Sequence, residues 1–226
     1  VGDEPLLLSE IAPTWIGIDR NKSFELASEN GADCIVMDDG FQNPTLQKDF
    51  SIIVINGEQG FGNKRVMPSG PLRESINRGL SRTNLVITIG EISESVKEKI
   101  PKHIPLITAN FKIKEDDMML KGQSVTAFAG IAYPEKFFNS LKLVKANIID
   151  TISYSDHHIY SEDDLLHLAE IANKNKSILV TTKKDMVRIP KNYRSLVKTI
   201  DGFIDLDDEK ILLEILSNLI ENKINQ

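Results

Sequence analysis

The sequence has 226 residues, 41% of them hydrophobic, with a formal net charge of −6 and a pI near 5.3. It is long enough for one large or two modest domains, and its charge argues against a general nucleic-acid binder, which needs a dense Lys/Arg surface. The single cysteine, Cys34, excludes a disulfide framework and a multi-thiolate zinc site, and the chain has no apolar run of the eighteen or so residues that a membrane helix needs.

The first expected elements are a helix over residues 22–30 and a strand over residues 34–37. Gly31 lies between them, at the position where a left-handed glycine commonly ends a helix. Cys34 belongs to the apolar run of the strand, and we expect it to fill space in the core.

Asp38 and Asp39 follow that apolar run directly, and Gly40 then allows a sharp turn. Because a strand that ends in two carboxylates places acid at the mouth of a sheet, the pair is typical of a magnesium site for phosphoryl transfer. Asp-Gly is also a common turn dipeptide. From these residues alone, a metal site and ordinary turn chemistry both remain open.

Further strands are expected over residues 51–55, 85–89 and 104–108, alternating with polar, helix-like stretches. This alternation is the pattern of an α/β domain with a mainly parallel sheet. The fold class predicted from the sequence is therefore α/β.

A loop over residues 63–74 contains two prolines and ends in Arg73 and Glu74, before an expected helix. A rigid loop of this kind can hold Arg73 over a phosphate, because a planar guanidinium binds two oxygens at once. The alternative is a surface loop in which Arg73 and Glu74 pair with their neighbours.

Residues 112–123 are polar and show no hydrophobic period, so we expect them to connect two lobes. The predicted division is residues 1–111, the connection 112–123, and a smaller α/β lobe over residues 124–226. The elements expected in the smaller lobe are a strand over 124–128, a helix from Pro134 that carries Phe137, Phe138 and Leu141, a helix capped by Ser161 and Asp164, a strand over 177–182 and an amphipathic helix over 208–222.

Asp156, His157 and His158 place three proton-handling or metal-binding side chains in a row. Adjacent side chains of an extended segment face opposite ways, so Asp156 and His158 would share one side and His157 would point to the other. We therefore expect at most one of the two histidines at the chemistry and the other in a structural role.

Two further groups are ambiguous from the residues alone. Asp3 and Glu4 stand at the beginning of the sequence, where we expect frayed, solvated side chains. Lys183, Lys184 and Asp185 follow an expected strand and could hold a phosphate or only form a turn.

Taken together, six blocks of the sequence resemble the tetraacyldisaccharide 4′-kinases, the P-loop kinases of the lipid A pathway. The resemblance extends over nearly the whole chain. The blocks, in order, are Gly2-Asp3-Glu4-Pro5, Asp38-Asp39-Gly40-Phe41-Gln42, Gly70-Pro71-Leu72-Arg73-Glu74, Phe128-Ala129-Gly130-Ile131 with Pro134-Glu135-Lys136-Phe137-Phe138, Asp156-His157-His158, and Thr182-Lys183-Lys184-Asp185.

The resemblance implies the remaining part of a P-loop-type, mainly parallel sheet domain and a second, smaller α/β lobe that closes over the substrate, with the active site between them. It implies phosphoryl transfer from ATP, with Mg²⁺, to the 4′-hydroxyl of a tetraacylated glucosamine disaccharide 1-phosphate. The product would be lipid IVA, formed at the cytoplasmic face of the bacterial inner membrane. The implied partners are thus ATP, a glycolipid and the membrane surface, and no nucleic acid.

The resemblance also implies roles for individual residues. Asp38 and Asp39 match the family's Walker B position and would be ligands, direct or through water, of the nucleotide-bound Mg²⁺. Asp3 matches the proposed base on the sugar hydroxyl, aided by His157 or His158.

The blocks that line the family's site also contain Gln42, Arg73 and Glu74, which would position phosphate and substrate. The sequence departs from the family at Asn43, where a histidine is frequent, and at Lys183, where glutamate is usual.

No G-x-x-x-x-G-K-[ST] motif occurs in the sequence, so the lysine and backbone cradle that would hold the ATP phosphates are not among these residues. The family carries this loop upstream of its Gly-Asp-Glu-Pro block, together with an N-terminal membrane helix. We therefore expect a truncated chain, and little or no kinase activity from these 226 residues alone.

Two alternatives belong to other classes. One is a metal-dependent phosphoesterase, suggested by Asp156, His157 and His158 together with the separate pair Asp38 and Asp39. The other is a non-catalytic, degenerate fragment that folds and binds lipid or a partner. Mn²⁺-dependent hydrolysis of a phosphodiester without ATP would favour the first, and a phosphate loop in an adjacent upstream reading frame would argue against the second.

Overall fold

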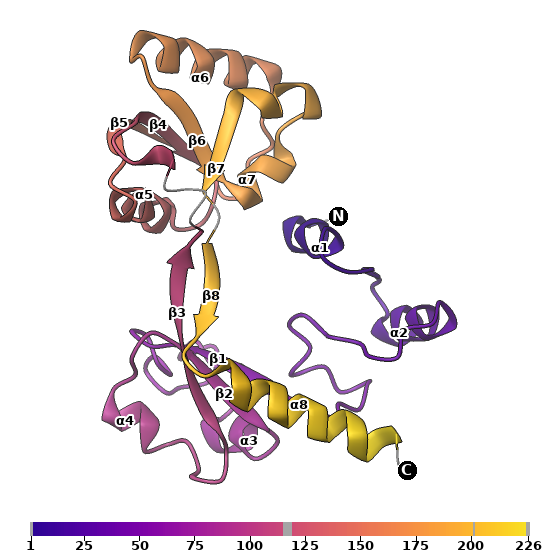
Figure 1. The fold of residues 1–226 in the computed structure, drawn as a ribbon. Helices are drawn as coiled ribbons and strands as arrows, with labels where there is room; N and C mark the ends of the chain where they lie inside the picture. The colour runs from indigo at the N-terminus through magenta and orange to yellow at the C-terminus, as the bar shows by residue number, and fades with distance from the viewer. Residues whose placement is uncertain (1, 115–118, 201, 225–226) are drawn as a thin grey trace. The chain divides into compact units, whose positions relative to one another are not determined.

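The structure of the protein, a computed structural model, describes residues 2–114, 119–200 and 202–224, without the side chains of 222–224. The described chain is an α/β fold with two four-stranded sheets (Figure 1), which confirms the predicted fold class. It divides into two compact units. Unit 1 combines Val1–Ile16 with Ile113–Phe203, and unit 2 combines Gly17–Lys112 with Ile204–Gln226.

The sheet of unit 2 has the strand order β1-β2-β3-β8. Its members are β1 (Ile52–Asn56), β2 (Leu85–Ile89), β3 (Leu106–Ile113) and β8 (Gly202–Leu206). The first three are parallel, and the short helices α3 (Ile76–Leu80) and α4 (Glu94–Lys97) lie in the crossovers between them. The strands predicted near residues 51–55, 85–89 and 104–108 are therefore confirmed, with shifted ends for the first and third.

The helix predicted over residues 22–30 is α2 (Arg20–Glu29). The Asp19 side chain caps it by accepting a hydrogen bond from the Asn21 backbone N–H, and Gly31 has a φ of +84°, as expected for the residue that ends the helix. The last helix along the chain, α8 (Glu209–Ile224), also belongs to unit 2. Within the described part of the chain, no helix is both long and apolar enough to span a bilayer.

The strand predicted over residues 34–37 is wrong. The segment is irregular, Val36 is 92% exposed and Cys34 is exposed rather than buried in a core. A strand is held by hydrogen bonds to a neighbouring strand, and the unit 2 sheet, as described, has no strand paired with this segment. An apolar run alone does not supply that partner.

The sheet of unit 1 has the order β5-β4-β6-β7, with β4 paired in parallel to β5 and β6, and β6 to β7. Its members are β4 (Ser124–Ala129), β5 (Asn147–Ser153), β6 (Ile178–Thr182) and β7 (Val197–Ile200). Two helices, α5 (Pro134–Leu143) and α6 (Glu162–Lys174), lie on opposite sides of this sheet (Figure 1).

The central strand β4 is buried on both faces. Val125, Ala127 and Ala129 pack in the cluster that contains the buried residues of α5, whereas Phe128 packs with α6. This alternation follows from the two-residue period of a strand. The predicted capping box of α6 is present, because the side chains of Ser161 and Asp164 each accept a hydrogen bond from the other's backbone N–H.

The first residues of the chain belong to unit 1, together with residues 113–203. The prediction had placed them in the other lobe, over residues 1–111. Helix α1 (Asp3–Ser9) forms ion pairs with α7 (Lys183–Arg188), which is followed by the 3-10 helix η2 (Lys191–Leu196). The division also differs at the other end, because β8 leads the chain back into the sheet of unit 2. Within the predicted connection, residues 115–118 lie outside the described residues.

Candidate active site

Asp3, at the start of α1, is held inside unit 1. Its residue is only 6% exposed, and its Oδ2 lies 3.1 Å from Nδ1 of His157 and 3.3 Å from Nε of Arg188. The expectation of a frayed, solvated Asp3 is therefore wrong, because two side chains from distant parts of the sequence enclose its carboxylate. Glu4 is half-exposed, and its carboxylate pairs with Lys184 at 2.5 Å.

His157 lies in a turn rather than in an extended segment. Its φ is +57°, and its backbone N–H donates to the carbonyl of Gly130 over 3.0 Å. The predicted alternation of side chains does not apply to such a turn. Asp156 consequently lines the same cavity as His157, instead of sharing a side with His158.

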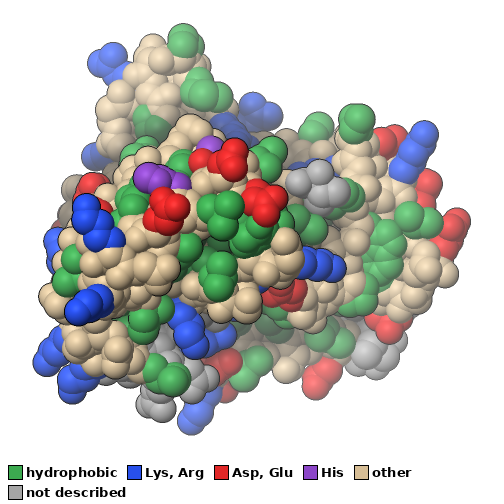
Figure 2. All heavy atoms as spheres, turned by 90° about the horizontal axis from the view of Figure 1, so that it is seen from above, with side chains coloured by type: hydrophobic (Ala, Val, Ile, Leu, Met, Phe, Trp, Pro, Cys, Tyr) green, Lys and Arg blue, Asp and Glu red, His purple; other side chains and the backbone are tan. Residues whose placement is uncertain are grey.

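The ring of His158 has a different environment. Its Nε2 lies 3.1 Å from Oδ2 of Asp164, and it stacks on Tyr154 with a centroid distance of 4.5 Å. Hydrogen bonds from Ser161, and then from His158, lower the pKa of the Asp164 carboxyl. Figure 2 shows histidine side chains (purple) directly beside acidic ones (red). The structure thus separates the two histidines, and Asp3 is contacted by His157.

Sequence reasoning missed Arg188, and it left Asp185 undecided between a phosphate site and a turn. Asp185 is fully buried. Its Oδ1 accepts hydrogen bonds from the Gly130 N–H at 2.9 Å and the Tyr160 hydroxyl at 2.8 Å, and it lies 3.1 Å from Nη2 of Arg188. The pKa of Tyr160 is raised, mainly by burial and next by the nearby charge of Asp185. The ion pair between Asp185 and Arg188 could have been predicted from local spacing, because the two residues are three positions apart and so lie on one face of a helix.

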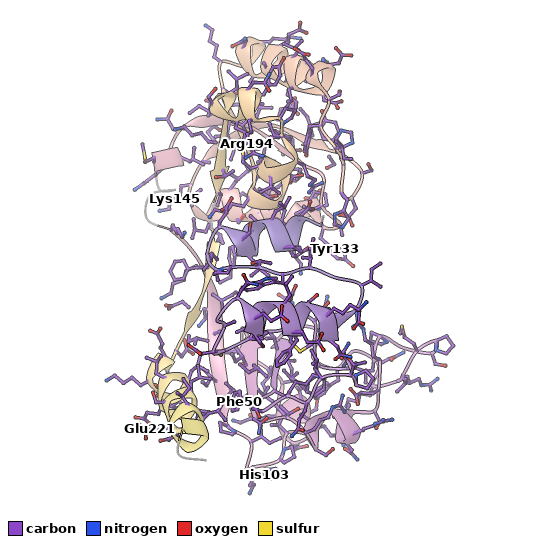
Figure 3. The ribbon with its side chains drawn as sticks, turned by 90° about the vertical axis from the view of Figure 1, so that its right-hand side faces the viewer. Phe50, His103, Tyr133, Lys145, Arg194 and Glu221 are labelled. Carbon is purple, nitrogen blue, oxygen red and sulfur yellow. The ribbon has the colours of Figure 1, made fainter. Side chains whose placement is uncertain are left out.

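A cavity of about 380 Å³ opens beside the Asp3 and His157 pair. Figure 3 shows Tyr133, one of its lining residues, beside α1. Its acidic, basic and histidine lining residues are Asp3, Glu4, Lys136, Asp156, His157, Lys184 and Arg188. An anionic or hydroxyl-bearing ligand could therefore meet both a carboxylate and several cations there.

In unit 2, Glu74 is the centre of a hydrogen-bonded group. Its Oε1 accepts from Nε2 of Gln42 at 3.2 Å, and its two oxygens bind the Arg82 guanidinium at 2.5 and 2.6 Å. The bond from Arg82 is the main reason why the pKa of Glu74 is lowered. Arg82 also lies 4.3 Å above the Phe41 ring. The family resemblance placed Gln42 and Glu74 in blocks that line the site but did not predict their contact, and the sequence did not single out Arg82.

Arg73, next to Glu74, is exposed. The loop before it is tied across itself, because Leu72 donates to the Arg65 carbonyl and Met67 donates to the Leu72 carbonyl. The Asn63 amide donates to the Ser69 carbonyl over 2.8 Å. The loop expected from the sequence is therefore present, with hydrogen bonds across it, and Arg73 is exposed at its end.

Asp38 and Asp39 are both exposed. The left-handed residue of their turn is Asp39, with a φ of +50°, rather than Gly40. Gly40 is needed for another reason, since a Cβ there would lie 2.5 Å from Cβ of Met37. The Asp38 carbonyl accepts a hydrogen bond from Arg20 at 3.1 Å.

The fit of this pair to a metal ion depends on the ion. Among the described residues, no group of three or more His, Cys, Asp or Glu side chains is arranged to hold a metal. Mg²⁺ does not need such a cage, because it usually binds one or two carboxylates and takes its other ligands from water and phosphate. Two adjacent, solvent-facing carboxylates at positions 38 and 39 fit that pattern.

Comparison with solved structures places the fold. The crystal structure of the "apo" form of LpxK from Aquifex aeolicus in complex with ATP superimposes with a TM-score of 0.72, at 22% identity. The match covers 96% of this chain and 69% of that chain. The two proteins therefore share their fold.

Comparison of sequences identifies the family. The chain is 44% identical over 200 residues to the tetraacyldisaccharide 4′-kinase of Gluconobacter oxydans, covering 88% of this chain and 61% of that protein. It is 40% identical over 228 residues to the tetraacyldisaccharide 4′-kinase of Rhodospirillum rubrum, and the match covers 99% of this chain and 69% of that protein. The chain thus spans about two thirds of the length of these relatives. A family model described as tetraacyldisaccharide-1-P 4′-kinase (LpxK) matches residues 1–221, so the chain belongs to the tetraacyldisaccharide 4′-kinase family.

Proposed function

We propose that this chain supplies the acceptor-activating part of an ATP-dependent kinase that phosphorylates the 4′-hydroxyl of tetraacyldisaccharide 1-phosphate to give lipid IVA. Membership of the family supports the reaction. The observation that carries the assignment is the contact of 3.1 Å between Asp3 Oδ2 and His157 Nδ1 at the edge of a cavity. The proposed partners are ATP, the acylated disaccharide and the cytoplasmic surface of the inner membrane, where the substrate's acyl chains reside.

In this mechanism Asp3 orients the sugar hydroxyl and accepts its proton. A strong base is unnecessary, because the transferred phosphoryl group passes through a loose transition state and the nucleophile's proton leaves late. His157 donates from Nδ1 to Asp3 and so fixes the direction of the carboxylate. His158 is assigned no chemical step, because its ring bonds to Asp164.

Asp38 and Asp39 are proposed to hold the nucleotide-bound Mg²⁺. When bound, the ion would neutralise charge that develops on the phosphate oxygens. Arg73 is proposed to bind a phosphate, since its guanidinium faces solvent. Glu74 is proposed to act indirectly, by holding the Gln42 amide in place through the bond of 3.2 Å.

The test is ATP-dependent phosphorylation of the disaccharide by two proteins: this chain, and a version extended upstream to include a phosphate-binding loop. We expect robust turnover from the extended protein only, because these residues contain no such loop. An Asp3→Asn variant of the extended protein should lose about 10²–10⁴-fold in kcat. Equal turnover by both unmodified proteins would refute the need for the loop, and full activity of the variant would refute the role of Asp3.

A further inference from the structure

We infer that Arg188 is a positioning residue, which holds the Asp3 carboxylate against His157. The catalytic importance of Arg188 rests on the proposed function of Asp3, whereas the contacts of Arg188 are independent of that proposal. The side chain of Arg188 is 8% exposed and that of Asp3 is 9% exposed, and Nε of Arg188 lies 3.3 Å from the same Oδ2 that contacts His157. One carboxylate oxygen is thus shared by a guanidinium and an imidazole.

The other nitrogens of the guanidinium fix its own position. Nη1 donates to the carbonyls of Gly130, at 2.9 Å, and of His158, at 3.1 Å. Nη2 lies 3.1 Å from Oδ1 of the fully buried Asp185. Nε donates to the carbonyl of Lys184 at 3.1 Å, so its contact with Asp3 is an ion pair. Because all three nitrogens of this rigid plane have partners, the guanidinium has little freedom to move relative to them.

Arg188 contacts the parts of unit 1 that hold Asp3 and His157. The Gly130 carbonyl that accepts from Nη1 also accepts from the His157 backbone N–H, over 3.0 Å, and His158 is the next residue in the chain. Arg188 therefore connects the turn that presents His157 to the helix that begins at Asp3. This connection is what a positioning role requires, and a residue that only stabilised α7 would not need it.

The charge and the fork of Arg188 have separate consequences. Lysine at this position would keep a positive charge near Asp3 but would lose the planar set of donors to the two carbonyls. Methionine would keep much of the volume and lose both. If the charge holds Asp3, Arg188→Lys should preserve the Asp3 and His157 contact to a large extent, and Arg188→Met should lose it.

The contact can be read from the tautomer of His157 in this chain, without any activity. A neutral imidazole carries its proton on one nitrogen, and a hydrogen bond from that nitrogen selects the tautomer. At mildly alkaline pH, ¹⁵N NMR of histidine-labelled protein should show the proton of His157 on Nδ1. The resonance is assigned with His157→Asn, and Asp3→Ala defines the signal of a lost contact.

We expect the Nδ1–H fraction of Arg188→Met to fall to the Asp3→Ala value and that of Arg188→Lys to stay near the wild type. Arg194→Met is the matched control, because Arg194 also donates to backbone carbonyls, those of Ile189 and Val187, each at 2.9 Å. Figure 3 labels Arg194. Its variant should leave the His157 signal unchanged. If Arg188→Met does not fold, Arg188→Gln removes the charge and keeps a donor.

An unchanged His157 tautomer in folded Arg188→Met or Arg188→Gln would overturn the inference. Turnover of the extended protein then separates this inference from the proposed function. If the tautomer is lost but kcat stays at the wild-type value, Arg188 does position Asp3, and the assignment of Asp3 as the base is wrong. If tautomer and kcat fall together in Arg188→Met and are rescued in Arg188→Lys, both are supported.

Discussion

Nε2 of His158 lies 3.1 Å from Oδ2 of Asp164, the residue that completes the capping box of α6. His158 also packs against Tyr154 and Tyr160, at centroid distances of 4.5 and 4.9 Å. His157, in contrast, has a side chain that is 65% exposed. Of two adjacent histidines, His158 therefore packs against neighbouring rings, whereas the His157 side chain is largely exposed to solvent.

The first prediction concerns this difference. His158→Ala should lower the free energy of unfolding of unit 1 by about 1–3 kcal/mol, because it removes a packed ring and its hydrogen bond to Asp164. His157→Asn should change it by about 0.5 kcal/mol or less, since asparagine tolerates the positive φ of this position. Urea unfolding followed by fluorescence measures both.

For turnover the order of the two variants is reversed. In the upstream-extended protein, His157→Asn should reduce kcat by about 10²-fold or more, and His158→Ala should reduce it much less at temperatures where the protein stays folded. Full activity of His157→Asn, together with inactivity of a folded His158→Ala, would show that the wrong histidine has been assigned to Asp3.

The second prediction concerns the buried carboxylate of Asp185. Asp185→Ala should lower the free energy of unfolding by about 3–5 kcal/mol, because it removes one of the two carboxylates that pair with the buried Arg188 and leaves the Tyr160 hydroxyl without its acceptor. Asp163→Ala, on the exposed face of α6, is the matched control and should change it by less than about 1 kcal/mol. Equal stability of the two variants would mean that the buried network contributes nothing to folding.

The third prediction is a pH dependence at Glu74. The bond from Arg82 holds the pKa of Glu74 below its ordinary value of 4.5 in the folded state. A lowered folded-state pKa gives stability that is fully present above the ordinary value and is lost as the pH falls through the folded value. Glu74→Gln should therefore be less stable than the wild type by about 1–2 kcal/mol near neutral pH.

That difference should shrink as the pH falls below 4.5. Urea unfolding of both proteins across this acidic range measures it. Glu58→Gln, at an exposed position in the same unit, is the control and should stay close to the wild type at each pH. A difference between Glu74→Gln and the wild type that stays constant with pH would show that the charge of Glu74 is not its source.

Elements with a strong hydrophobic period were predictable from the sequence. The strand over residues 85–89 is observed at those bounds, and α5 buries Phe137, Phe138 and Leu141 as expected. The segment over residues 34–37 has a similar apolar composition but forms no strand. The difference is a hydrogen-bonded neighbour, and a local pattern contains no information about which distant strand will provide one.

The candidate site was predictable in its residue types but not in its contacts. Asp3 and His157 are 154 positions apart, so their contact depends on how α1 packs against the rest of unit 1, and no spacing rule reaches that far. The same holds for Gln42 and Glu74, which are 32 positions apart. The αL turn at His157 also escaped prediction, because histidine adopts a positive φ only occasionally.

The last prediction concerns the carboxylates proposed to bind Mg²⁺. Asp38→Asn and Asp39→Asn should each reduce turnover of the extended protein and raise the Mg²⁺ concentration needed for half-maximal rate, because an amide oxygen is a weaker ligand than a carboxylate. Neither should change the free energy of unfolding by more than about 0.5 kcal/mol, since both side chains are exposed. Asparagine also tolerates the left-handed backbone of Asp39. The exposed Asp33, replaced by Asn, is the control. If the Asp38→Asn, Asp39→Asn double variant kept the wild-type Mg²⁺ dependence, the ion would have to be held by other residues, and the pair would be a turn and nothing more.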